Sequence, residues 1–310
     1  MKSVAFVAVV LSAHVPSHSA GADSKAWTSG KSVISGSENI VGGISASSVR
    51  ASALYQQWLP MLLSQAGDAK TALEAITKEC SIDMLASLDS IAFGIDNNQT
   101  GSIVIALKGT NHKALDACAQ KLGKADNKTV TITTEGKFTK YEGMGDKPVY
   151  LQWLAADVFA VSTSPDDKDA STKLLSSGVT SNKAMSKALG AINKGASAWL
   201  IVDKEQAIEG VGKVEQIYGN AVVANKKITL TGHIVTDTPA TATSLSATAT
   251  KKLADAQAGA SKSLQAAIGS VSLKAAGADI SASAAIAEDD VVALMMSVLQ
   301  ARALADVVRD

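Results

Sequence analysis

Large aromatic side chains and cysteine are both scarce in this chain. Phe, Trp and Tyr make up only 4% of the 310 residues, so a folded core must be lined mainly by Ala, Val, Leu and Ile. Aromatic platforms for carbohydrate binding are weakly supported for the same reason. The composition is still that of a globular protein, because 46% of the residues are hydrophobic and only 19% are charged. A chain of this length contains one large domain or two of ordinary size.

The N-terminus has the three features of a secretory signal peptide. Lys2 is a short basic region, Val4–Ala13 is an apolar run of suitable length, and Ala20–Ala22 is a small-x-small cleavage site. These features predict cleavage after Ala22, a mature chain that begins at Asp23, and a location in the periplasm or outside the cell. The alternatives are a buried strand and an N-terminal anchor.

An excess of charge of either sign is lacking. The 29 Lys and Arg residues balance the 29 Asp and Glu residues. Cleavage after Ala22 would remove Lys2 and no acid, leaving 28 basic residues (29 − 1) against 29 acidic ones. We therefore expect neither nucleic acid nor an anionic membrane surface as a partner of this chain.

No later segment is expected to cross a membrane. The most apolar one, Val291–Val308, is predicted to be a helix with an apolar stripe on one side only, because Gln300, Arg302 and Asp306 interrupt it. The mature chain is therefore predicted to be soluble, with no transmembrane segment.

Two cysteines remain in the mature chain, Cys80 and Cys118. In an oxidising compartment, an even pair most simply forms one disulfide. That bridge would close a loop of 39 residues (118 − 80 + 1), for which the chain-entropy model gives about 4 kcal/mol of stabilisation. The alternatives are two free buried thiols and a metal-binding pair, although a Cys/His zinc site has no recognisable ligand spacing here.

Residues with catalytic potential are few. His112 and His233 are the histidines that remain after signal removal, and we find no sequence neighbour that would make either a catalytic base. The motifs G-x-S-x-G, H-E-x-x-H, the P-loop and G-x-G-x-x-G after a strand are absent from the sequence. We therefore assign no catalytic, cofactor-binding or metal-binding residue, and we expect no cofactor.

The order of predicted elements indicates an α+β fold built from two similar halves. Residues 23–38 are rich in Gly, Ser and Lys and are predicted to be a flexible N-terminal segment. The halves, residues 39–180 and 181–310, are each predicted to contain a mainly antiparallel sheet with helices on one face, because hairpin-connected strands precede helices. Internal duplication is preferred over a chance similarity between two α+β domains.

One predicted unit, Asp89–Leu122, recurs around Asn220–Leu253. It consists of two strands joined by a polar turn, followed by a helix. Strands are predicted at Asn39–Ser45, Ser90–Asp96, Ser102–Lys108, Thr129–Thr134, Lys137–Glu142, Pro148–Trp153, Val158–Thr163, Ala198–Val202, Lys227–Thr236, Ser270–Lys274 and Asp279–Ala285. Further helices are predicted at Val49–Gln65, Ala69–Glu79 and Ala184–Asn193, and others are predicted to start at Pro165, Lys204 and Pro239.

The segment from Cys80 to about residue 163 resembles a bacterial protein family. Its Cys80-Ser81-Ile82-Asp83 step precedes a strand, a second strand and a helix that contains Cys118. In this respect it is similar to a group of uncharacterised, secreted two-repeat proteins of myxobacteria-like proteomes, in which the step reads Cys-Gly-Ile-Asp. The resemblance implies an α+β repeat and a Cys80–Cys118 disulfide, and it implies no activity.

Three functions are compatible with these features. The leading hypothesis is a non-enzymatic binding or scaffolding protein, secreted or periplasmic, whose partner is unknown and could be another envelope protein. The alternative is a carrier of apolar, lipid-like ligands in a cavity between sheet and helices. The third is a hydrolase with an acidic site. The sequence leaves the ligand and the oligomeric state open.

Overall fold

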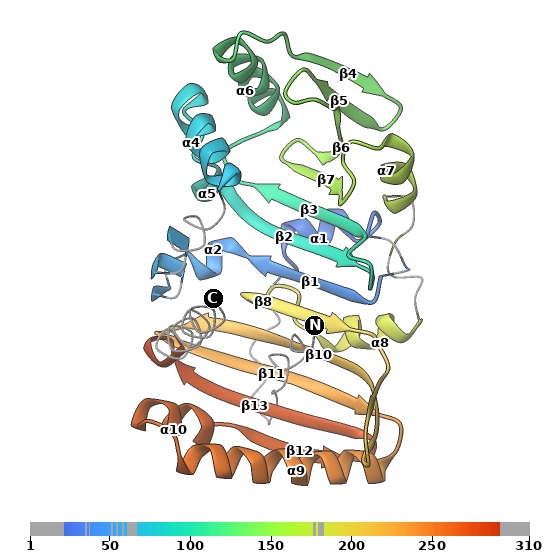
Figure 1. Cartoon of the computed structure of the whole chain (residues 1–310), viewed down its shortest axis with the longest axis vertical. Helices are drawn as coiled ribbons and strands as arrows, with labels where there is room; N and C mark the ends of the chain where they lie inside the picture. The colour runs from blue at the N-terminus through green and yellow to red at the C-terminus, as the bar shows by residue number, and fades with distance from the viewer. Residues whose placement is uncertain are drawn as a thin grey trace, which may run out of the picture. The chain divides into compact units, whose positions relative to one another are not determined.

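The computed structural model of the chain describes residues 22–34, 36, 38–50, 52–53, 55–57, 59–60, 67–175, 178 and 183–291. The predicted signal peptide, apart from Ala22, lies outside these residues, as do the predicted final helix beyond Val291 and part of the predicted helix Val49–Gln65. The described residues form an α+β fold of antiparallel strands, as predicted (Figure 1). They divide into an N-terminal unit (22–48 and 60–203) and a C-terminal unit (49–59 and 204–291).

The N-terminal unit is built on a sheet with the strand order β8-β1-β2-β3-β7-β6-β5-β4. The predicted strand Ala198–Val202 is found with the same bounds as β8, and the other strands of this unit are within two residues of their predicted bounds. Those strands are β1 Ile40–Ser45, β2 Leu88–Ile95, β3 Gly101–Leu107, β4 Thr131–Glu135, β5 Phe138–Glu142, β6 Val149–Ala155 and β7 Val158–Ser162.

Four helices of this unit begin at a side-chain cap: Ser24, Asp83, Asn111 or Asp167. Asn111 precedes α6 and accepts a hydrogen bond from the N–H of Ala114 at 3.1 Å, which satisfies one of the unpaired donors of the first turn. The helices are α1 Lys25–Gly30, α2 Ala46–Val49 (which ends at the boundary with the C-terminal unit), α4 Asp68–Cys80, α5 Met84–Ser87, α6 His112–Ala125, α7 Lys168–Leu174 and α8 Lys183–Ala191.

The prediction of a flexible segment at residues 23–38 is wrong, because α1 packs against the sheet. Trp27 is only 2% exposed, and its ring meets that of Trp199 in β8 edge-on with the centroids 5.0 Å apart. Gly30 approaches β3 so closely that a Cβ there would lie 2.5 Å from Val104 Cγ2. A single buried Trp and a close-packed glycine are tertiary features that a Gly/Ser-rich composition does not reveal.

The C-terminal unit has the strand order β12-β13-β11-β10, with β9 paired to β10. Its core is formed by apolar side chains of β10, β11, β13 and α9: Val214, Ile234, Ile280 and Ala242. The predicted cap of α9 is confirmed, since Thr238 accepts a hydrogen bond from Thr241 N–H at 3.1 Å. The elements are β9 Gln206–Ile208, β10 Gly212–Ala224, β11 Lys227–Thr236, α9 Pro239–Ala258, α10 Lys262–Gly269, β12 Ser272–Ala276 and β13 Asp279–Ala287.

Two predicted helix starts are corrected by the structure. No helix begins at Lys204; β9 and β10 are found there, because Gly210 and Gly212 have φ values of +72° and +137° that a helix does not accommodate. The helix expected to begin at Pro165 begins at Lys168. Asp167 is its N-cap, because its Oδ1 accepts hydrogen bonds from the N–H groups of Asp169 and Ala170.

Candidate functional site

One face of the sheet in the N-terminal unit is apolar and has no described helix over it. From Ser90 onward, every second side chain of β2 is buried, and the alternate ones, Ile91, Phe93 and Ile95, are half-exposed. Ala26 of α1 donates its N–H to Ser90 Oγ at 3.0 Å, which places α1 on the buried face. Figure 1 shows α1 behind β2 and β3, so the half-exposed side chains are on the face turned to the viewer.

The strand register extends this apolar face across the sheet. Ile44 of β1, which is 41% exposed, lies opposite Ile91, and Ile91 lies opposite Ile105 of β3. Ile105 in turn lies opposite Phe159 of β7, which lies opposite Trp153 of β6. These residues form one continuous row. Further apolar residues lie on the same face of the sheet, on either side of this row. We call the whole set the open apolar face: Ile40, Ile44, Ile91, Phe93, Ile95, Ile103, Ile105, Trp153, Phe159, Val161, Leu200 and Val202.

The open apolar face is continuous over β1 because Gly42 has no side chain. A Cβ at this position would lie 2.6 Å from Phe93 Cζ and 3.1 Å from Leu200 Cδ1, so these two side chains meet above the strand. Apart from the indole N–H of Trp153, no side chain of the face carries a polar atom. The face therefore offers hydrophobic contact and almost no hydrogen-bonding group to a ligand.

At the β6 end of the row, the face ends on a cluster of polar and aromatic side chains. His112 of α6 stacks on Trp153 with ring centroids 4.3 Å apart and an interplanar angle of 18°. Its Nε2 lies 3.1 Å from Oδ2 of Asp116, one helical turn later. The hydroxyl of Tyr141 in β5 donates to Oδ1 of the same carboxylate at 2.6 Å. We call His112, Asp116, Tyr141 and Trp153 the polar corner.

The electrostatics of the polar corner define its hydrogen-bonding groups. Burial raises the pKa of Tyr141 well above its usual range, and the hydrogen bond to Asp116 acts in the same direction, so Tyr141 remains a donor at neutral pH. The carboxylate beside Nε2 favours the imidazole tautomer that carries its proton on Nε2. Nδ1 of His112 is then an acceptor, and among the described residues it makes no hydrogen bond.

The predicted disulfide is confirmed. Cys80 and Cys118 are joined, with their Cα atoms 5.3 Å apart, and the described residues contain no free cysteine. The bridge joins the end of α4 to α6, so it holds the helix that carries His112 and Asp116. The alternatives of two free thiols or a metal-binding pair are thereby excluded.

The C-terminal unit contains a second histidine with a carboxylate partner. Nδ1 of His233 lies 2.7 Å from Oδ1 of Asp279, and the imidazole stacks on Tyr218 with centroids 4.9 Å apart. Burial raises the pKa of Tyr218, and the charge of Asp279 adds to the effect. Each histidine therefore has a carboxylate partner that was not identified from the sequence. The His112–Asp116 pair could have been predicted from the sequence, because residues at i and i+4 of a helix are neighbours. The His233–Asp279 pair could not, because its two residues are 46 positions apart.

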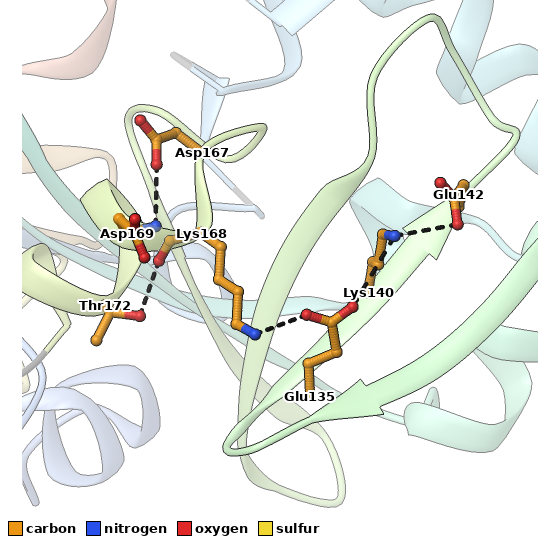
Figure 2. Close-up of polar contacts among 7 residues, drawn as sticks. All are labelled: Glu135, Lys140, Glu142, Asp167, Lys168, Asp169 and Thr172. Atoms are coloured by element: carbon orange, nitrogen blue, oxygen red, sulfur yellow. Dashed lines mark hydrogen bonds and ion pairs between the residues drawn. The ribbon is translucent and has the colours of Figure 1, made fainter.

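A charged network joins the β4–β5 hairpin to α7 (Figure 2). Lys168 Nζ donates to Glu135 Oε2 at 2.7 Å, and Lys140 Nζ lies 3.1 Å from Glu142 Oε2 and 3.9 Å from Glu135 Oε1. The hydrogen bond from Lys168 lowers the pKa of Glu135, and the charges of both lysines act in the same direction. The network contains alternating charges that compensate one another, so we assign it to the stability of the hairpin.

Neither a membrane-spanning helix nor a metal-binding cluster is found among the described residues. None of their helices combines the length and the apolar character needed to cross a membrane. The same residues contain no group of three or more His, Cys, Asp and Glu side chains placed to hold a metal ion.

Comparison with known proteins identifies neither a family nor a curated relative, because no family model and no curated protein matches this chain. Solved structures with a similar arrangement include crystal forms I, III and IV of TP0453. They have 7%, 7% and 8% sequence identity and TM-scores of 0.47, 0.45 and 0.47. The matches cover 86%, 86% and 85% of this chain and 95%, 96% and 94% of the TP0453 chains. We draw no functional conclusion from them.

Proposed function

We propose that this chain is a secreted or periplasmic, non-enzymatic binding protein that holds an apolar ligand on the open apolar face. The observation that carries the proposal is the row from Ile44 to Trp153, which brings apolar side chains of five strands side by side, with Phe159 buried and the other four at least partly exposed. Contiguous apolar surfaces of this kind mark binding sites in soluble proteins. The ligand would lie on a sheet face, and not in the cavity between sheet and helices that the sequence suggested.

A small apolar ligand fits this surface better than a protein partner does. Protein interfaces carry about one hydrogen bond per 100–200 Å² of buried area. The open apolar face has one polar side-chain atom, on Trp153, and the backbone groups of its inner strands are paired within the sheet. A hydrocarbon ligand has no polar groups, so none of its groups would lack a hydrogen bond when it binds to this face.

The location outside the cytoplasm is supported by the Cys80–Cys118 disulfide, because such bridges persist in oxidising compartments. Together with the sequence features of residues 1–22, this supports export and cleavage after Ala22. We also retain the internal duplication as a hypothesis, in which residues 39–180 and 181–310 derive from two copies of an ancestral α+β repeat.

Binding of an uncharged apolar dye, N-phenyl-1-naphthylamine, to purified protein tests the proposal. We expect saturable fluorescence enhancement and a loss of affinity of at least about tenfold in Ile44→Lys, because the ammonium group would stand within the ligand site. The matched control is Val222→Lys in β10 of the C-terminal unit, since Val222 is 38% exposed and Ile44 is 41% exposed.

The control variant should bind the dye like the wild type. Absence of saturable binding to the wild type, or equal loss in both variants, would contradict the proposed function. Native mass spectrometry of the protein after mild extraction provides an independent readout, in which a co-purifying apolar molecule should be present in the wild type and depleted in Ile44→Lys.

A further inference from the structure

The geometry of the polar corner points to the class of ligand: we infer that it is a single-chain amphiphile with an uncharged, hydroxyl-bearing head. This inference rests on the proposed function. It follows from the position of the polar corner at one end of the row, where Trp153 belongs both to the open apolar face and to the stack with His112. An apolar chain on the row therefore ends beside hydrogen-bonding groups.

The length of the row suits one long acyl chain. From Ile44 in β1 to Trp153 in β6 the row crosses four strand-to-strand steps, β1-β2-β3-β7-β6, which at about 4.8 Å each span about 19 Å. One leaflet of a bilayer's hydrocarbon core, half of about 30 Å, is about 15 Å thick. An extended acyl chain can thus lie wholly on the face while its head remains at the polar corner.

The polar corner selects the head group through His112. Asp116 Oδ1 accepts a hydrogen bond from Tyr141 and Oδ2 lies 3.1 Å from His112 Nε2, so both carboxylate oxygens already face a group of the protein. His112 Nδ1 is the remaining acceptor, and a hydroxyl can donate to it. A carboxylate or phosphate head has no proton to donate at neutral pH, and it would be repelled by the charge of Asp116. The corner therefore disfavours an anionic head and accommodates an uncharged head with an O–H group.

Displacement of the dye by monolauroylglycerol, laurate, dodecylamine and dodecane tests this inference, because the four share one chain and differ in the head. We expect monolauroylglycerol to bind about tenfold more tightly than laurate or dodecane, which is the effect of one hydrogen bond of about 1.4 kcal/mol. His112→Phe keeps a ring on Trp153 and removes Nδ1, so it should abolish the preference. His233→Phe is the matched control and should retain it.

Asp116→Asn is a second, independent variant. Removal of its charge should increase the affinity for laurate and leave dodecane binding unchanged. An equal or higher affinity of the wild type for laurate or dodecylamine would overturn the inference, as would a preference that survives in His112→Phe. Flotation with phosphatidylcholine vesicles should leave the protein unbound; co-flotation without binding of monomeric ligands would assign the face to a bilayer surface instead.

These outcomes separate the two proposals. If no apolar compound binds, the proposed function itself fails. If dodecane and the three amphiphiles bind equally on the open apolar face, the function stands and the assignment of the head group fails.

Discussion

Two adjacent glycines of β1 make room for aromatic rings on the two faces of the sheet. Gly42 and Gly43 of β1 lie on opposite faces of the sheet, and each leaves room for a ring from a neighbouring strand. Phe93 covers Gly42 on the open apolar face, and Trp199 covers Gly43 on the buried face. The first contact shapes the candidate ligand site and the second contributes to the core. The absence of a side chain at Gly42 thus makes room in the candidate site, and its absence at Gly43 makes room in the core.

Gly43→Ala should destabilise the protein by about 1–3 kcal/mol, the usual effect of overpacking. A Cβ at position 43 would lie 2.6 Å from Trp199 Nε1 and 3.0 Å from the carbonyl oxygen of Ile91, which belongs to the backbone and cannot move aside. The measurement is the urea midpoint followed by circular dichroism. Gly145→Ala, which meets no atom within 4 Å, should change the midpoint little; a similar loss in both variants would contradict the argument.

At the scale of elements, a disulfide and an ion pair link segments that are distant in the sequence. The Cys80–Cys118 bridge holds α4 against α6. The ion pair between Glu135 and Lys168 holds the β4–β5 hairpin to α7 (Figure 2). The first link is covalent and its effect is independent of pH, whereas the second depends on the charge of Glu135.

Replacement of both cysteines, Cys80→Ser with Cys118→Ser, should lower the free energy of unfolding by about 2–5 kcal/mol, because the unfolded chain gains the entropy of an open loop. Urea unfolding of the double variant measures this, and a reductant added to the wild type should produce the same shift. We also expect the double variant to lose selectivity for hydroxyl head groups, since α6 carries His112. An unchanged unfolding midpoint would show that the bridge constrains nothing in the unfolded chain.

The pairing of Glu135 with Lys168 predicts a pH dependence of stability. The folded-state pKa of Glu135 is lowered, first by its hydrogen bond from Lys168. The stabilisation is therefore fully present above the unfolded-state pKa of Glu135 and is lost as the pH falls through its folded-state pKa. Because the carboxylate is exposed to solvent, the effect is small. Glu135→Gln should lower the urea midpoint at neutral pH and not in acid; an equal difference at both pH values would contradict the assignment.

At the scale of the molecule, the described residues form two compact α+β units, each with an antiparallel sheet. The candidate ligand site lies wholly within the N-terminal unit. In the C-terminal unit, the corresponding feature is the His233–Asp279–Tyr218 cluster, which lacks an adjoining row of large apolar side chains: Thr231 and Thr229 follow His233 on its face of β11. The two units therefore present different chemistry beside their histidines, and this difference makes His233 a matched control for His112.

Export of the whole chain predicts a defined covalent state. Expression of the full sequence in a secreting bacterial host should yield a mature protein that begins with Asp23 and has no labelled thiol after unfolding without reductant. N-terminal sequencing and intact-mass measurement check both points together. A chain that retains residues 1–22, or that contains two labelled cysteines, would contradict export through an oxidising compartment.

The sequence by itself determined the fold class, most element bounds and the disulfide. Local structure depends on residues that are neighbours in the chain: apolar alternation, turn residues, and caps such as Asn111 and Thr238. For this reason the strands Ala198–Val202 and Lys227–Thr236 were predicted with their observed bounds. The same local logic failed at Lys204, where the positive φ values of two glycines overruled a helical pattern.

The tertiary structure alone decided where the candidate site lies. Ile44, Ile91, Ile105, Phe159 and Trp153 form one row only because five strands pair in a particular order and register. The helix α1 packs on the opposite face of the sheet, which a Gly/Ser-rich sequence did not reveal. Strand order and face coverage depend on contacts between residues that are far apart in the chain, and no local pattern of a single sequence specifies them.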